Sequence, residues 1–103
     1  MKGAGIPFKT ESSIRIQFFI GVAALALGFY LGISRMDWLW IIMAITIVLI
    51  TETMNTAIEK LVDLVSPGYN QIAGLVKDIA AGAVFMAAVA ALIIGAIVFI
   101  PYF

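Results

Sequence analysis

Three long apolar stretches, separated by short polar links, dominate the pattern of the chain. They fall at about 14–33, 38–64 and 79–102, and as helices each can cross a hydrocarbon core of about 30 Å. The short link at 34–37 predicts a tight helical hairpin, and Pro67 and Gly68 in the longer link at 66–75 stop the second helix. The pattern predicts an all-α membrane protein with three transmembrane helices and a single domain over 1–103.

Composition agrees with this class and narrows the chemistry. The chain of 103 residues is 64% hydrophobic and 12% charged, and its mean hydropathy is +1.17, well outside the range of soluble globular proteins. It has no Cys and no His, which excludes thiol chemistry, imidazole bases and the usual zinc ligands. Its net charge is zero, so nothing predicts binding to nucleic acid, and the chemistry must depend on carboxylates, amides, Lys and Arg.

Basic residues predict the orientation in a bacterial cytoplasmic (inner) membrane. Arg35 lies in the first link, whereas the other basic residues flank the start of the first span and the second link: Lys2, Lys9, Arg15, Lys60 and Lys77. The positive-inside rule then predicts a cytoplasmic N-terminus and, after three spans, a C-terminus outside. No secretory signal is recognised at the N-terminus, so the first span is expected to persist in the mature protein. Aromatic residues are expected at the outer interface: Trp38, Trp40, Tyr102 and Phe103.

The second span ends in a polar stripe. Asn55, Glu59 and Asp63 follow Glu52 by three, seven and eleven residues, so all four share one helix face. With about 1.5 Å of rise per residue, Glu52 lies about 21 Å from Trp38 and remains inside the inner leaflet, whereas Asp63 reaches the cytoplasmic boundary. A carboxylate at the depth of Glu52 is costly unless it is protonated or paired, which makes it a candidate functional group.

The other two spans bring polar groups to the same level. Glu11 and Arg15 form an i,i+4 pair at the start of the first span, and Lys77 and Asp78 stand at the start of the third. Carboxylates with an amide oxygen suit Mg²⁺ together with substrate phosphates. Arg15 and Lys77 would attract anionic oxygens. Three helices therefore converge where a lipid headgroup and a water-soluble cosubstrate can meet.

Each polar feature also has a purely structural interpretation. Asp63 taken alone is more simply a solvated group at a helix end. The Glu11–Arg15 pair can be a surface pair, and Glu52 with Asn55 can form hydrogen bonds between helices. Their shared depth favours the functional interpretation, because packing alone gives no reason for acids, amide and bases to converge.

The pattern E52-T-M-N55-T-A-I-E59-x-x-V-D63, followed by A73-G-L-V-K77-D78, resembles the prokaryotic integral-membrane diacylglycerol kinases and undecaprenol kinases. The resemblance begins at F8-K-T-E11-S-S-I-R15 and covers nearly the whole chain. It implies a homotrimeric three-helix enzyme with active sites shared between subunits. It also implies transfer of the γ-phosphate of ATP, with Mg²⁺, to the hydroxyl of a membrane lipid.

The resemblance assigns roles to individual residues. Glu11 and Glu59 would be the metal ligands, and Glu52 would activate the lipid hydroxyl. Five further residues would contact the nucleotide or its phosphates: Asn55, Lys77, Arg15, Tyr69 and Gly74. Asp78 would be a further active-site acid. By this resemblance the predicted activity is a lipid kinase that converts diacylglycerol to phosphatidic acid or undecaprenol to undecaprenyl phosphate. The sequence leaves the choice between these lipids open.

Several positions depart from the family pattern. The sequence has no phosphate-binding loop of the GxxxxGK[ST] or GxGxxG type. The amphipathic helix usual at the start of the family is shortened and contains Pro7, Gln17 stands where an ionisable group is common, and Ala81 replaces a Ser of the proteobacterial enzymes.

Two other functions compete with the lipid kinase. Small proton-coupled transporters of similar length also use a membrane carboxylate, but they have four spans and carry the acid in the first. A noncatalytic accessory subunit could use the polar stripe to bind a partner helix. Oligomerisation is expected, because three short helices cannot enclose a polar site inside the membrane.

Overall fold

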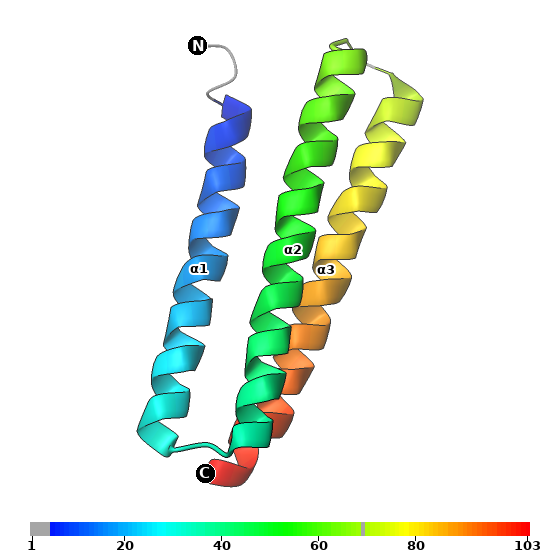
Figure 1. Cartoon of the computed structure of the whole chain (residues 1–103). Coiled ribbons are helices and arrows are strands. Elements are labelled where there is room, and N and C mark those ends of the chain that lie inside the picture. The colour runs from blue at the N-terminus through cyan, green and yellow to red at the C-terminus, as the bar shows by residue number, and fades with distance from the viewer. Residues whose placement is uncertain (1–4, 69) are drawn as a thin grey trace.

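The structure, a computed structural model, describes residues 5–68 and 70–103, with side chains from Arg15 onward. Three helices run back and forth: α1 spans Gly5–Leu31, α2 spans Arg35–Val65 and α3 spans Gln71–Phe99. A short 3-10 helix, η2, follows at Ile100–Tyr102. Figure 1 shows the link between α1 and α2 and the C-terminus at one end, the α1–α2 end, and the link between α2 and α3 at the other, the α2–α3 end. The predicted all-α fold with three helices is confirmed.

The link between α1 and α2 lies earlier than the sequence predicts. Gly32 has a positive φ of 65°, which glycine adopts without strain and which ends α1. The N–H groups of Gly32 and Ile33 donate to the carbonyl of Gly28 at 2.9 and 3.2 Å. Ser34 then caps α2, because its Oγ accepts the N–H of Asp37 at 3.1 Å. The predicted link at 34–37 is therefore wrong by about one turn, since its last three residues already belong to α2.

The link between α2 and α3 is shorter than predicted. α2 ends at Val65, just before Pro67. Asn70 caps α3, and its Oδ1 accepts the N–H groups of Ile72 at 2.9 Å and Ala73 at 3.0 Å. α3 therefore begins at Gln71, which turns the second half of the predicted link at 66–75 into helix.

α2 packs more closely against α3 than against α1. The core cluster lies at the α1–α2 end and consists of Ile33, Ile41 and Val98. Trp38 packs directly on Gly28, because a Cβ added to Gly28 would lie 2.7 Å from Cη2 of the indole. Trp38 is thus half-buried between helices, and its predicted place at the outer interface stays a prediction.

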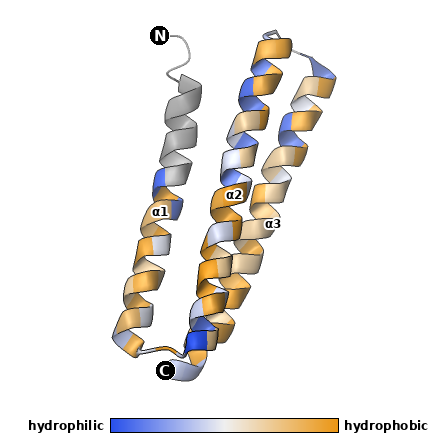
Figure 2. Cartoon of the chain, viewed as in Figure 1, coloured by the Kyte–Doolittle hydropathy of each residue, from blue (hydrophilic) through white to orange (hydrophobic). Residues whose placement is uncertain are grey.

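The surface of the helices is largely apolar. Figure 2 shows hydrophobic positions along the middle of α2 and α3, and hydrophilic ones toward the α2–α3 end of both helices and at the start of α2. In the described part of the chain, two segments are long and apolar enough to cross a membrane: Arg35–Val65 and Gln71–Tyr102. The apolar part of α1 covers 17 residues, Arg15–Leu31, or about 26 Å of helix. That α1 crosses the membrane as the first span therefore stays a prediction.

Candidate functional site

Glu52 is enclosed within the fold. Its side chain is 4% exposed, and among the described side chains it is the buried charged one. The other buried positions of α2 are Ile41, Ala44 and Val48, which precede it at helical spacings of three and four residues. Glu52 thus continues the face that α2 turns inward, and its predicted depth in the inner leaflet stays a prediction.

Threonine hydroxyls around Glu52 are satisfied within α2 itself. Thr53 Oγ1 donates to the carbonyl of Leu49 at 2.8 Å, and Thr56 Oγ1 donates to the carbonyl of Glu52 at 3.0 Å. Such back-bonding satisfies a hydroxyl without an external partner. The hydroxyl of Thr56 is therefore engaged with the main chain of Glu52.

Asn55 offers an unused oxygen next to this carboxylate. Its Oδ1 is enclosed and has no hydrogen-bond partner among the described residues. Buried polar atoms are normally paired, so an enclosed free acceptor indicates a ligand or an ion. Glu59 is half-buried one turn further along the same face. An amide oxygen and a carboxylate at this spacing are hard donors that fit Mg²⁺.

Lys77 is fixed by an ion pair at the α2–α3 end. Its Nζ donates to Oδ1 of Asp63 at 2.6 Å. The pair joins the last turn of α2 to the second turn of α3 and keeps the ammonium on the side of the polar stripe. Asp63 taken alone is predicted to be a solvated group at a helix end. In the structure it remains partly exposed and also has a partner, because the hairpin of α2 and α3 brings together residues that are fourteen positions apart.

The remaining predicted site residues do not form a cluster with Glu52, Asn55 and Glu59 in the described part of the chain. Asp78 and Arg15 are exposed, and consecutive positions such as Lys77 and Asp78 differ by about 100° around a helix. Gly74 lies near the start of α3 with open space where a Cβ would be. The side chain of Glu11, and Tyr69 as a whole, lie outside the described residues. Their predicted roles are therefore neither confirmed nor contradicted.

Among the described residues, no group of three or more acidic side chains is placed to hold a metal ion. Glu59 and the free oxygen of Asn55 are donors that this part of the chain can contribute. Magnesium commonly binds to one or two carboxylates and takes its other ligands from water and phosphate. This donor set therefore fits a metal that arrives with a nucleotide better than a permanently bound one.

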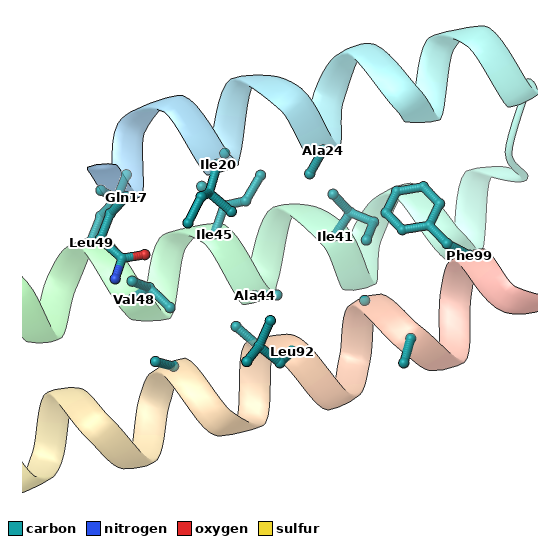
Figure 3. A pocket seen from close by; sticks show the side chains of 15 residues that line it. Gln17, Ile20, Ala24, Ile41, Ala44, Ile45, Val48, Leu49, Leu92 and Phe99 are labelled. Carbon is teal, nitrogen blue, oxygen red and sulfur yellow. The ribbon is translucent and has the colours of Figure 1, made fainter. Parts of the chain in front are cut away.

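An apolar pocket lies between the three helices (Figure 3). Its volume is about 360 Å³, and its walls are mostly small or aliphatic side chains. Val48 and Leu49 line it one turn or less before Glu52, and Phe99 closes the other end. Figure 3 shows the amide of Gln17 directed from α1 toward Val48 and Leu49. A hydrocarbon chain with a polar end fits such walls.

Similarity to known proteins identifies the family of this chain. A sequence profile described as prokaryotic diacylglycerol kinase matches residues 1–99. The chain belongs to the prokaryotic diacylglycerol kinase family. The family resemblance predicted from the polar stripe is thereby confirmed.

Curated members of the prokaryotic diacylglycerol kinase family carry both names that the sequence predicts. The chain is 37% identical over 100 residues to a diacylglycerol kinase of Synechocystis sp., a match that covers 96% of this chain and 57% of that protein. It is 37% identical over 93 residues to an undecaprenol kinase of Bacillus subtilis, covering 90% of this chain and 76% of that protein. The identity to the diacylglycerol kinase of Escherichia coli is 27% over 92 residues, covering 89% and 75%. The chain thus spans little more than half of the Synechocystis relative.

Proposed function

We propose that this chain transfers the γ-phosphate of ATP to the hydroxyl of a membrane lipid, either diacylglycerol or undecaprenol. The observation that carries the proposal is the enclosed carboxylate of Glu52, which begins the polar stripe about one turn after Val48, a residue that lines the apolar pocket. Names of both kinds among the relatives support the reaction class. Because these two relatives are equally identical to the chain, the choice of lipid requires an experiment.

In this proposal, residues along α2 carry out the phosphoryl transfer. The lipid hydroxyl approaches Glu52 from the pocket and gives its proton to the carboxylate as its oxygen attacks the γ-phosphorus. The new O–P bond forms while the bond between the γ-phosphorus and the β,γ-bridging oxygen breaks, and ADP leaves. About 10 Å of helix separates Glu52 from Glu59, so the lipid end and the nucleotide end of the site fit on one stripe.

Polar and charged residues near Glu59 would bind the phosphates of ATP and the metal that accompanies them. Magnesium bound with ATP would neutralise charge on the β- and γ-phosphates. Glu59 and Asn55, with Glu11, would hold the metal. Lys77 would contact phosphate oxygens with the donors that Asp63 leaves available. Arg15, Tyr69 and Gly74 are proposed to contact the nucleotide, and Asp78 is proposed as the further acid.

We also propose a homotrimer that spans the bacterial cytoplasmic membrane three times. Many large apolar side chains are exposed on the single chain, for example Phe29 at 78% and Leu92 at 71%, which suits a surface covered by lipid and by other copies. The N-terminus would be cytoplasmic and the C-terminus outside. Cross-linking in the membrane, and labelling of each terminus from either side, tests these two statements.

Purified protein in mixed micelles with γ-labelled ATP and magnesium tests the activity. Diacylglycerol and undecaprenol are offered separately, and kcat/KM for each lipid is compared. Label in one of the lipids is the expected result and identifies the substrate. Absence of label from both lipids, with protein that remains folded, would contradict the proposed activity.

A further inference from the structure

The ion pair between Asp63 and Lys77 has a geometry that suits it to nucleotide binding. The Nζ–Oδ1 distance is 2.6 Å, and the two side chains are 34% and 36% exposed. The pair is therefore firmly in contact and still open to a ligand from the α2–α3 end. Partly exposed ion pairs add little to stability, which leaves a stabilising role as a weak explanation for it.

We propose that Asp63 is a positioning residue that holds the Lys77 ammonium in place for the phosphates of a nucleoside triphosphate. The proposal rests on the proposed lipid kinase function and extends it to a residue whose position alone predicts a solvated group. Asp63 would not touch the nucleotide itself. It would act through Lys77.

The position of Asp63 on α2 explains why it can direct the ammonium. Asp63 follows Glu59 by four residues, so both carboxylates lie on one face of the helix. Lys77 comes from α3, and its long side chain would otherwise sample many rotamers and remain hydrated. The contact with Asp63 selects the rotamers that keep the ammonium beside the metal-binding end of the stripe.

The donors of Lys77 are sufficient for both partners. An ammonium group has three N–H donors, and Asp63 Oδ1 accepts one of them. Two donors then remain for phosphate oxygens. Asp63 also balances the charge of the ammonium in a membrane helix end, so Lys77 stays in place whether or not nucleotide is bound.

Two substitutions at Asp63 separate positioning from stability. In Asp63→Ala the acceptor is lost, and kcat/KM for Mg·ATP should fall at least about tenfold, as expected when a hydrogen bond to a charged group is removed. In Asp63→Asn an acceptor oxygen remains, so the loss should be smaller. KM for the lipid should stay unchanged in both variants, because the lipid approaches from the Glu52 side.

Asp37→Asn is the matched control. Asp37 is also an aspartate of α2 that accepts a 2.6 Å hydrogen bond, here from Tyr102 after α3, but it lies at the opposite end of the fold. This variant loosens α3 from α2 without touching the stripe. It should lower the melting temperature at least as much as Asp63→Asn does and leave KM for Mg·ATP unchanged.

Nucleotide binding gives a second readout that needs no turnover. A nonhydrolysable ATP analogue with magnesium should raise the melting temperature of the wild-type protein, and Asp63→Ala should reduce that increase. In a Lys77→Met background, Asp63→Ala should have no further effect on this increase in melting temperature.

Two results would overturn the inference. One is that Asp63→Ala leaves both KM for Mg·ATP and the increase in melting temperature unchanged, and the other is that Asp37→Asn loses as much as Asp63→Ala does. If the wild-type protein binds the analogue but labels no lipid, the kinase proposal fails while the role of Asp63 is still measured; if it binds no nucleotide, both fail.

Discussion

Tyr102 and Asp37 meet at 2.6 Å, where the phenolic hydroxyl after α3 donates to Oδ2 of the aspartate in the first turn of α2. The same hydroxyl accepts the N–H of Ser34 at 3.1 Å. The last residues of the chain are thereby tied to the link between α1 and α2. Polar side chains of α2 therefore have partners at both ends of the hairpin, because Asp63 meets Lys77 at the opposite end.

Tyr102→Phe should lower the free energy of unfolding by about 1 kcal/mol, because it removes the donor to Asp37 and the acceptor for Ser34. Thermal unfolding in detergent micelles measures the change. Tyr30→Phe is the control, since Tyr30 is 85% exposed and should tolerate the change. Equal stability of the two variants would contradict the proposed role of this contact.

Gly28→Ala should destabilise the α1–α2 end by about 1–3 kcal/mol, because the new methyl would lie 2.7 Å from the indole of Trp38 and force it to move. Gly21→Ala is a control on the same helix, seven residues earlier, where the nearest atom, Cγ2 of Ile45, is 3.5 Å away. There the methyl fits, and alanine favours the helix. A Gly28→Ala variant as stable as Gly21→Ala would contradict the described packing of Trp38.

Asn70→Ala should cost about 1 kcal/mol of stability, because the N–H groups of Ile72 and Ala73 lose their acceptor. Asn70→Asp restores an acceptor oxygen at the same place and should recover most of the loss. Both are compared by chemical unfolding in micelles. Failure of Asp to outperform Ala would show that the cap contributes little.

Glu59→Gln should abolish lipid phosphorylation while leaving the oligomer folded, because the amide is a far weaker magnesium ligand than the carboxylate. Activity with labelled ATP and size-exclusion chromatography are measured on the same preparation. Raising the magnesium concentration should restore part of the activity of a weakened site. Full turnover by the folded variant would remove Glu59 from the metal site.

The helices and the polar stripe of α2 can be predicted from the sequence, because both depend on periodicity. Apolar stretches of sufficient length specify the helices, and spacings of three and four residues place Glu52 in line with Ile41, Ala44 and Val48. Local capping was harder to predict. Ser34 and Asn70 each start a helix earlier than the hydrophobic pattern does, because a cap depends on one side chain and not on an average over many.

Contacts between helices could not be predicted from periodicity. Whether Asp63 meets solvent or Lys77 depends on the register of α2 against α3, which the link and the buried alanines Ala80 and Ala87 set together. The same holds for Trp38, whose place on Gly28 depends on how α1 returns along α2. The family pattern identified the residues of the stripe, and the fold identified the partner of Lys77.

Glu52→Gln is the measurement that tests the central claim most directly, with kcat for phosphoryl transfer to lipid and KM for Mg·ATP determined on the same protein. If the enclosed carboxylate takes the proton of the lipid hydroxyl, kcat should fall by about 10²–10⁴ while KM for Mg·ATP changes little. Unchanged kcat, or an equal loss of ATP binding and turnover, would contradict this account.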